Sequence, residues 1–570
     1  MANHQGGREI AMDNMRGFTR RRFLGGMALL GLTPVYSRVA AALPPFTPEK
    51  RWTGDDFDEG HRIMRNAQAL ARNTKDWERH AGTYDAIIVG GGISGLTVAY
   101  KLRERNILLL EREPQTGGVS KSDNWNGIEY SLGAAYVIDP DSESEDPRER
   151  ENYELLHELG LRDAKEEIEG EKGKGKDRRL AGDANHCVFT NRALIPEEEV
   201  YSHQNVEFFK HVLEKGPYPY IPPTNPELVE KLDSVSFRQF IRDPKLQQQI
   251  YGKHLGAITP PGSEAIEYYF WGAFGCNSWE TSAYHGLNFF AAEFGKILVF
   301  PGGNAFVARR LDERIRQHNA NIIQTGHWVL SIEPEKEKGG YSVLAYRDNK
   351  IHHYRAKAVV FSAPLFLARK MIPGLPDEQQ KVIESLDYRS FVVANVLLRR
   401  RMDQIFTKEE AFARSYELTR VHDLDVTRYQ PDVLSTEKVF SDVVVGDFAV
   451  WRHSTYAVLT IYRPYPYSYG RDRLRFLTYD AVEAEVRRAV LEGFGQHGLR
   501  ESDIEGIRLS RWGHPMIIPR PGQLANGVMK KATQTTPGLF FAHTDIQGAP
   551  AFENAMASAQ HAVEGVRKYL

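Results

Sequence analysis

The chain has 570 residues, 41% of them hydrophobic and 26% charged, so it can bury more core than one average domain holds. Its 73 basic and 75 acidic residues give a formal charge of -2, which argues against nucleic acid or an anionic membrane as a partner. Cys187 and Cys276 are the only cysteines, too few for a cysteine-rich zinc site, an iron-sulfur cluster or a C-x-x-C-H haem attachment. Any metal would need histidines and carboxylates, and we expect no metal site. The two thiols either form one disulfide or lie buried separately.

Residues 1–42 have the composition of an export signal. Arg20, Arg21 and Arg22 precede a short apolar run that glycines and a proline dilute, and small residues follow, where we expect cleavage. The segment resembles a twin-arginine signal, whose export machinery carries folded proteins. It is too short and too weakly apolar to remain as a membrane anchor. We therefore expect a periplasmic or otherwise exported protein, with residues 43–83 as an N-terminal arm.

A strand, a glycine-rich turn and a helix follow the arm. Apolar residues 84–89 predict the strand, and Gly90, Gly92 and Gly95 come directly after it. Gly90 permits a tight turn, Gly92 lets the backbone approach a pyrophosphate, and Gly95 allows the helix to pack closely on the strand.

A second strand, at residues 107–110, ends at Glu111, about 20 residues beyond the glycines. A carboxylate in this position accepts hydrogen bonds from the adenosine ribose and repels the 2′-phosphate of NADP. The intervening helix begins at Ile93 and Ser94, so its N terminus faces the phosphates. Strand, glycines, helix, strand and acid in this order predict a Rossmann-type dinucleotide site.

The continuation distinguishes a flavin site from a nicotinamide site. Arg112 comes directly after the acid, and Gly117, Gly118 and Val119 form a turn before the sequence GIEYSLGAA. This pattern resembles the flavin amine oxidase and phytoene desaturase superfamily, in which the Gly-Gly turn lies along the flavin pyrophosphate and ribityl chain. The family commonly has a basic residue where this chain has Val119, so that polar contact is in doubt unless Lys121 replaces it.

Two distant segments match the same family. Residues 300–304 (FPGGN) resemble its Pro-x-Gly-Gly element and lead to the strands that complete the FAD domain, where the resemblance implies that Val329 touches the adenine through its backbone. Near the C terminus, residues 538–545 predict a strand that ends in Asp545. In the family this acid binds the ribityl or pyrophosphate region.

A helix rich in small residues follows from residue 552. In the family the N terminus of this helix approaches the flavin pyrimidine carbonyls, which implies contacts from Phe552, Asn554 and Ala555. Its dipole stabilises negative charge on the reduced flavin. No cysteine lies near this motif, so cysteinyl attachment is excluded there; we expect non-covalent FAD, with histidyl attachment left open.

The resemblance implies an α/β fold, in which a Rossmann-type FAD-binding domain of the amine oxidase, glutathione-reductase-like kind is interleaved with a mixed α+β substrate domain. The flavin motifs assign residues 84–137, 296–365 and 511–570 to the FAD domain. Residues 138–295 and 366–510 interrupt these motifs and form the substrate domain.

Two segments supply candidate catalytic residues. Aromatic side chains crowd residues 268–294; most are core, and we single out Tyr284 and His285 as a pair that guides a neutral amine beside the flavin. Before the last FAD strand, the family places a tryptophan-containing stretch against flavin and substrate, which implies that role for Trp512. His514 follows, and an imidazole with a pKa near neutrality takes a proton from a substrate ammonium or hydroxyl. A histidine that hydrogen-bonds a turn explains His514 equally well.

The stretch around Trp512 and the strand at residues 391–398 resemble bacterial spermidine dehydrogenases. Many amine oxidases place a lysine in that strand, bound through water to flavin N5, and this chain has none there. Because the lysine helps reduced flavin react with oxygen, its loss favours a quinone or a cytochrome as the electron acceptor.

The first hypothesis is therefore an amine or polyamine dehydrogenase or oxidase: a hydride moves from the carbon next to nitrogen to flavin N5, and the imine hydrolyses. An FAD-dependent desaturase or isomerase of an apolar isoprenoid or porphyrinogen is the second, and export counts against it. An amino-acid oxidase is the third, with Arg452, Arg463 or Arg511 holding the carboxylate. A binding or assembly protein that keeps FAD as a structural element is the fourth.

Overall fold

The structure is a computed structural model whose described residues are 52–144, 146–161, 187–190, 193–215, 226–294, 297–337, 339–407, 419–421, 442–445, 455–465 and 470–570. The predicted signal and Arg452 lie outside these ranges. Among the described helices, none is long and apolar enough to span a membrane.

The first sheet combines a parallel part with an antiparallel part. Its strands have the order β11-β4-β3-β14-β13-β12, and β20 pairs with the C-terminal end of β14. The 12-residue strand β14 joins both parts, because one edge pairs with β3 in parallel and the other pairs with β13 in antiparallel orientation. The strands are β3 (Tyr84–Val89), β4 (Ile107–Leu110), β11 (Ile323–Gln324), β12 (Trp328–Pro334), β13 (Tyr341–Arg347), β14 (Lys350–Phe361) and β20 (Leu539–Phe541).

Both faces of this sheet are buried under helices, as a parallel sheet requires. Ala86 and Ile88 of β3 contribute to one core, while Ile87 and Val89 contribute to the other. The first core contains α5 (Ile93–Lys101), α6 (Pro147–Glu158), α15 (Ala305–His318) and α23 (Phe552–Tyr569). The second contains α16 (Leu365–Met371), α17 (Asp377–Glu384) and α22 (Val528–Ala532).

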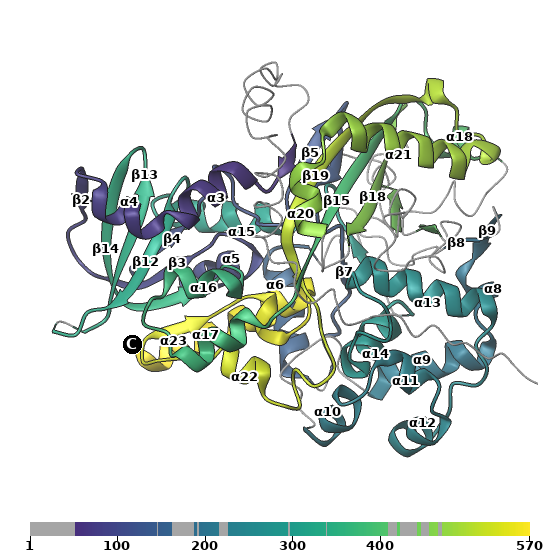
Figure 1. The fold of residues 1–570 in the computed structure, drawn as a ribbon, viewed down its shortest axis with the longest axis horizontal. Helices are drawn as coiled ribbons and strands as arrows, with labels where there is room; N and C mark the ends of the chain where they lie inside the picture. Colours follow the sequence, from purple (N-terminus) through teal and green to yellow (C-terminus); the bar gives the residue numbers. More distant parts are fainter. Residues whose placement is uncertain are drawn as a thin grey trace, which may run out of the picture. The chain divides into compact units, whose positions relative to one another are not determined.

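The second sheet is built around β15 (Tyr388–Leu398), which is buried along its whole length between β18 (Ala457–Tyr465) and β19 (Ile504–Ile517). Val392, Ala394 and Val396 project toward α21 (Tyr479–Phe494), which lies along this sheet in Figure 1. Phe391 and Val393 project to the opposite face, toward the hairpin of β5 (Ser122–Trp125) and β6 (Ile128–Ser131). The sheet continues through β17 (Asp442–Val445), β16 (Thr419–Val421), β8 (Cys187–Thr190) and β9 (Ala193–Pro196).

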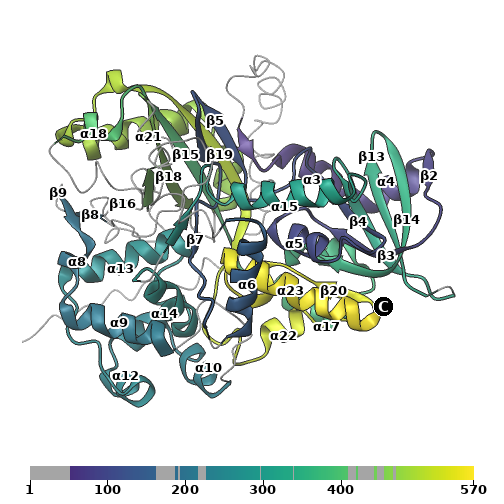
Figure 2. The same cartoon turned by 180° about the vertical axis from the view of Figure 1, so that it is seen from behind.

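A helical region adjoins the second sheet, as both Figure 1 and Figure 2 show. Its helices are α8 (Glu197–Val200), α9 (His203–Lys215), α10 (Pro226–Asp233), α11 (Phe237–Ile241), α12 (Pro244–Tyr251), α13 (Pro260–Ala273) and α14 (Ala283–Ala292). The buried guanidinium of Arg389 on β15 donates to the carbonyls of Trp271 on α13 (2.8 Å) and Tyr465 on β18 (3.0 Å), so one cation joins helices and sheet. Cys276 is a free, buried thiol in this region.

The N-terminal arm is part of both sheets from residue 52 onward. Strand β1 (Thr53–Gly54) pairs with β19, and β2 (Trp77–Arg79) pairs with β14. Between them lie α3 (Phe57–Arg65) and α4 (Ala67–Asn73). Asp55 fastens the segment at two points: its Oδ1 lies 3.0 Å from the Arg112 guanidinium, and its Oδ2 accepts from the Gly513 N–H at 2.8 Å.

The predicted fold class is confirmed, and each predicted strand and helix of the FAD domain is present. One detail differs from prediction. The boundary at residue 511 falls inside β19, which runs unbroken to Ile517 and belongs to the second sheet. Helix α6 begins shortly after the chain enters the predicted substrate domain, where Asp146 caps its N terminus and Pro147 occupies its first turn.

Replacing Asp55 by Asn tests how firmly the arm is held. The substitution removes the ion pair to Arg112 and brings an amide N–H toward a backbone N–H, so we expect the free energy of unfolding to fall by about 1 to 3 kcal/mol. Urea unfolding of the holoprotein measures this. Asp348→Asn, which breaks the exposed pair with Arg347, is the matched control and should leave stability unchanged. Equal stability of both variants would contradict the assignment.

Candidate active site

Two glycine turns approach each other at the C-terminal ends of β3 and β4. The Gly117 N–H donates to the Gly91 carbonyl at 2.8 Å, and Gly92 and Gly117 form an isolated parallel bridge. A Cβ on Gly118 would lie 3.2 Å from the Cα of Gly92, so the second turn has little room for a side chain at the crossing. We call these two turns, residues 90–95 and 117–118, the glycine cradle.

The cradle glycines are required for different reasons. Gly90 and Gly117 have φ of 108° and 121°, a region that favours glycine. A Cβ on Gly95 would lie 1.9 Å from the Gly90 carbonyl oxygen, so the helix could not pack at this distance. Gly92 differs, because a Cβ there would meet only the Cα of Gly118 at 3.9 Å. The protein therefore tolerates a Cβ at Gly92, and the approach of the pyrophosphate to this glycine stays a prediction.

Glu111 lies beside the cradle, as predicted. It is 7% exposed; its Oε2 accepts from the Gly91 N–H at 2.6 Å and its Oε1 from the Glu113 N–H at 2.8 Å. Each oxygen keeps a lone pair for a ribose hydroxyl. Arg112 turns away toward Asp55 and the ring of Trp328, 5.4 Å from its guanidinium carbon. Val329, predicted at the adenine, follows Trp328 at the start of β12 and is 4% exposed.

Two helix N termini without a side-chain cap adjoin this region. Gly92 precedes α5, which begins at Ile93 and Ser94, and Ala551 precedes α23. The two helices pack against each other, so both sets of free N–H groups are available at one end of the first core. The cradle, the acid and the two helix termini fit the diphosphate, ribose and pyrimidine of FAD in the order that the sequence predicted.

The three residues predicted to contact FAD at the N terminus of α23 differ from one another in burial and in hydrogen bonding. Phe552 is half-buried against the first core, and Ala555 is buried within it. Asn554 is fully buried; its Nδ2 lies 3.5 Å from the Ala549 carbonyl, and its Oδ1 has no hydrogen-bond partner among the described residues. An unpartnered buried amide oxygen accepts a donor from a ligand at low cost.

Asp545 already has protein partners. Its Oδ2 accepts from the Leu365 N–H (2.9 Å) and the Tyr388 hydroxyl (2.6 Å), and its Oδ1 lies 3.2 Å from Nδ1 of His543. Burial acts to raise the pKa of Asp545, but these partners outweigh burial and hold it below its usual value. The carboxylate thus fixes β15, α16 and the last strand relative to one another, and its contact with FAD stays a prediction.

Glu553, in the first turn of α23, was not predicted. Its carboxyl is 4% exposed and accepts from the Ile138 N–H at 2.5 Å. Burial, together with Glu149 and Glu293, raises its pKa to about 7, although the hydrogen bonds to the backbone act to lower it. The sequence did contain a signal for Glu553: a carboxylate at the second position of the helix whose N terminus is predicted to approach the flavin. Only the fold shows that two more carboxyl groups, from α6 and from the end of α14, lie near it.

Trp512 and His514 lie two residues apart on β19, where the pairing with β15 is irregular: Phe391 pairs with Trp512 and Arg389 with Met516, so strand alternation does not place the two side chains on one face. Trp512 is 3% exposed, donates to the Leu132 carbonyl at 2.8 Å and shares a cluster with Val119, directly after the cradle. Trp512 thus lies near the second glycine turn, and its contact with flavin and substrate stays a prediction.

His514 packs against the ring of Phe366, with ring centres 4.4 Å apart, and near Tyr388 at 6.3 Å. The expected pKa near neutrality is wrong: burial lowers the pKa of His514 to about 4, with Arg471 adding to the effect. The ring is therefore neutral at pH 7 and accepts or donates a hydrogen bond without carrying charge.

Tyr284 and His285 lie in a separate place, on α14 within the aromatic core of the helical region. Burial raises the pKa of Tyr284 and lowers that of His285 to about 4. Neither ring nitrogen of His285 has a hydrogen-bond partner among the described residues, and a Cβ on Gly548 would lie 3.6 Å from its Nε2. His285 thus faces the loop that leads into α23, whereas His514 faces α16.

Strand β15 contains no lysine, and other side chains occupy the strand in which the family places one. The β15 face toward the β5–β6 hairpin carries Phe391, Val393 and Asn395. Asn395, missed from sequence, is fully buried; it donates to the Ser131 carbonyl at 3.0 Å and accepts from Thr460 at 2.6 Å. Its polar atoms are thus used to join the hairpin to the sheet.

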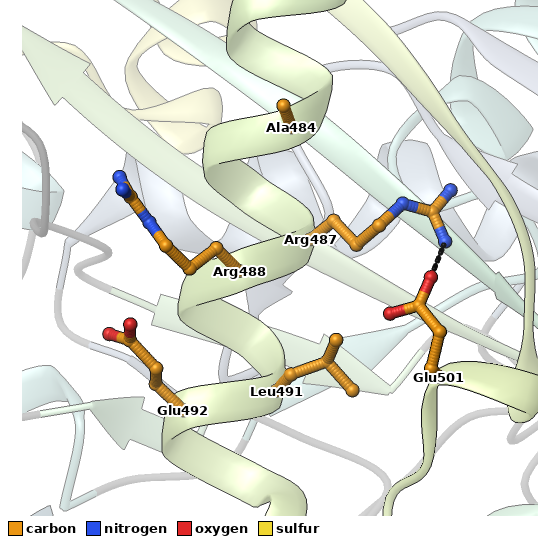
Figure 3. Close-up of a pocket in the computed structure, with 6 residues that line it drawn as sticks. All are labelled: Ala484, Arg487, Arg488, Leu491, Glu492 and Glu501. Atoms are coloured by element: carbon orange, nitrogen blue, oxygen red, sulfur yellow. Dashed lines mark hydrogen bonds and ion pairs between the residues drawn. The ribbon is translucent and has the colours of Figure 1, made fainter.

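A shallow depression of about 480 Å³ lies elsewhere, over α21 (Figure 3). An ion pair of 3.0 Å between Arg487 and Glu501 crosses it. Because α21 covers the face of the second sheet opposite to Trp512, this depression is not part of the candidate site.

The fold and the cradle define a flavin-dependent oxidoreductase. The chain belongs to the flavin containing amine oxidoreductase family, whose model matches residues 93–444, and this membership implies a flavin cofactor. It is 22% identical to oxidoreductase PigB of Serratia sp. (strain ATCC 39006) over 85% of this chain and 75% of that protein. A redesigned putrescine oxidase matches with a TM-score of 0.59 at 16% identity, over 85% of this chain and 99% of the other. A fatty acid isomerase from P. acnes matches with a TM-score of 0.56 at 14% identity, over the same two shares, so the fold is common to enzymes with different substrates.

Gly92→Ala separates the cofactor from the fold. Its Cβ meets no protein atom closer than 3.9 Å but occupies the approach to the diphosphate, so we expect unchanged stability and at least about tenfold weaker FAD binding. Flavin fluorescence during reconstitution of apoprotein measures the affinity. Gly493→Ala on α21, also free of close neighbours, should bind FAD normally. Unchanged affinity in Gly92→Ala would place the diphosphate elsewhere.

Proposed function

We propose that this protein oxidises an amine and holds FAD non-covalently. Bound FAD supplies the hydride acceptor for the carbon next to nitrogen. The chain orients that carbon, keeps water out and provides neutral hydrogen-bonding groups. The resulting imine hydrolyses after release.

The observation that carries the amine assignment is the acidic surrounding of the α23 N terminus. Glu149 and Glu293 both act on Glu553, and burial raises the pKa of Glu149 as well as that of Glu553. Carboxyl groups that repel one another inside a protein are stabilised by a cation. A second ammonium group of a polyamine would provide that cation, while the reacting amine stays neutral.

His514 and Trp512, on β19, act on the reacting amine. The neutral imidazole of His514 accepts a hydrogen bond from the amine N–H, which turns the nitrogen lone pair toward the carbon that loses hydride. With a pKa of about 4 the ring is too weak a base to deprotonate an ammonium at pH 7, so the amine reacts in its neutral form. Trp512, Phe366 and Tyr388 contribute apolar surface.

An amino-acid oxidase finds less support. Three arginines were considered for binding a substrate carboxylate, and the structure describes two of them, each in contact with other side chains. Arg463 forms a buried ion pair with Glu485. Arg511 lies over the rings of Phe57 (4.4 Å) and Trp52 (5.5 Å) on the N-terminal arm. A substrate carboxylate would also be repelled by Glu553 and its neighbours.

A desaturase or isomerase of an apolar substrate is the second candidate, favoured by the fatty acid isomerase among the structural matches. Three ionisable carboxyl groups near the flavin end disfavour an apolar chain there.

Non-covalent FAD is supported by Cys276, whose pKa burial raises to about 12, so this thiol is not a nucleophile. Val393 and Asn395 in place of the family lysine support a quinone or cytochrome acceptor.

Glu553→Gln tests the amine assignment through pH. Below pH 7 Glu553 is protonated and attracts no cation; above it, the carboxylate does. Diamine affinity should rise with pH in both proteins, because the reacting amine binds in its neutral form. We expect the wild type to show an additional rise between pH 6 and 8, and the variant to lack this addition and bind about tenfold more weakly at pH 8. Anaerobic stopped-flow reduction of the flavin measures the affinity. Glu564→Gln, exposed on the same helix, should behave as wild type. The same additional rise in Glu553→Gln would refute the role.

His514→Gln should leave FAD content intact and slow flavin reduction by a saturating amine about 10²-fold, because the nitrogen is no longer oriented. Replacing the exposed His561 in the same way should change nothing. If His514→Gln reduces as fast as wild type, this residue only packs against Phe366.

We further propose export by the twin-arginine route. Replacing Arg20 and Arg21 by Lys should leave the full-length precursor in the cytoplasm, whereas the wild type is recovered outside it in a shortened form. Cell fractionation with immunodetection separates the two results, and Arg22→Lys serves as the control. Normal export of the double variant would rule out this route.

A further inference from the structure

Three metal-ligating side chains meet where the N-terminal arm joins β14, away from the cradle. Strand β2 pairs with β14 in parallel, with Glu78 opposite His352, and the His80 N–H continues the ladder by donating to the His353 carbonyl at 3.1 Å. Residues directly opposite each other share a face of the sheet, as do residues two apart on one strand. Glu78, His80 and His352 therefore project to the same side.

Their ligand atoms converge. Nε2 of His80 lies 3.1 Å from Nδ1 of His352, and the two rings stack at 5.4 Å with an angle of 20°. The Glu78 carboxylate spans the pair: Oε1 lies 3.8 Å from His80 Nε2, and Oε2 lies 3.7 Å from His352 Nδ1. All three ligand atoms lie within 4.8 Å of one another.

These separations suit a single ion. Zinc binds imidazole nitrogen and carboxylate oxygen at about 2.0 to 2.2 Å, so two ligand atoms on a tetrahedral ion lie about 3.3 Å apart. The histidine pair is already within a few tenths of an ångström of this value. The carboxylate of Glu78, whose ligand atom lies within 4.8 Å of both histidine nitrogens, has to move closer to them, and its side chain is half exposed and free to do so.

The histidine rings are also held in place. His80 stacks on Tyr354 with ring centres 4.2 Å apart, and the Tyr354 hydroxyl lies 3.1 Å from Nε2 of His327. Nδ1 of His327 lies 2.9 Å from the Thr325 carbonyl, which completes a chain of contacts from the backbone to the site. Such outer contacts orient metal ligands and strengthen binding.

We propose that Glu78, His80 and His352 bind one divalent transition metal ion of the zinc type, with water completing the coordination. Two imidazoles and one carboxylate select zinc, nickel or copper over magnesium and calcium. The ion connects the arm to β14, and the arm carries Asp55, which holds Arg112 and β19. The site thus secures the arm, and its ligands lie outside the residues assigned to hydride transfer. The expectation of no metal site is replaced by this proposal.

Isothermal titration of tag-free, EDTA-treated holoenzyme with zinc chloride tests the proposal. We expect one zinc per chain for the wild type, and at least about tenfold weaker binding for His80→Gln and for His352→Gln. His353→Gln is the matched control: it is the next residue on β14, its Nε2 lies 2.9 Å from Ser342 Oγ, and its ring projects to the other face, so it should bind as wild type.

A second readout guards against misfolded variants. Zinc should raise the melting temperature of the wild type and of His353→Gln, and leave those of His80→Gln and His352→Gln unchanged, with FAD content equal in all four. No zinc binding by the wild type would show that the two histidines only hydrogen-bond each other. Equal affinity in all four proteins would place the ion elsewhere. Either result overturns the proposal.

Discussion

The rest of the site depends on the close approach of two backbone turns, which cross at Gly92 and Gly117–Gly118. A side chain at Gly95 or Gly117 would meet a backbone carbonyl near its own turn, and one at Gly118 would meet the backbone of the other turn. The crossing fixes the C-terminal ends of β3 and β4 together with the start of α5. Because these ends hold Glu111 and the free N–H groups of α5, the position of a dinucleotide follows from the crossing.

The substrate side is arranged around this fixed point by buried polar groups. Asp545 ties the last strand to α16 and β15, and Arg389 ties β15 to α13. Asn395 ties β15 to the β5–β6 hairpin. A buried polar group that loses its partner is costly, so each of these links resists displacement of one element against the next. The second sheet is thereby held at one position relative to the cradle.

Burial sets the charge state of two groups beside the candidate site. It raises the pKa of Glu553 at the start of α23 to about 7 and lowers that of His514 on β19 to about 4. The carboxyl group therefore titrates near neutral pH, whereas the imidazole is neutral there. The proposal of a diamine substrate rests on this difference.

Local patterns predicted the fold class and the arrangement of the glycine cradle, while the FAD contacts of its residues stay predictions. The glycines, Glu111 and the strands around them follow from residues close in sequence, and the structure contains each of them. Glu553 could not be predicted, because its pKa depends on Glu149 and Glu293, which approach only in the folded chain. The same holds for His514, whose burial is set by Phe366 and Tyr388.

The pairing of the N-terminal arm with both sheets could not be predicted from the sequence either. Its strands β1 and β2 are only two and three residues long, and their pairing with β19 and β14 leaves no periodic signal in the sequence. The predicted boundary at residue 511 failed for a related reason. It followed the family motif, while β19 carries the chain across it.

Anaerobic absorbance titration of the yellow holoenzyme with polyamines, monoamines and amino acids shows whether an amine reduces the flavin. We expect diamines or polyamines to bleach the flavin band and amino acids to leave it unchanged. Air should then restore the colour slowly and a quinone quickly. A flavin that dithionite reduces but that no amine bleaches would contradict amine oxidation and favour an apolar substrate.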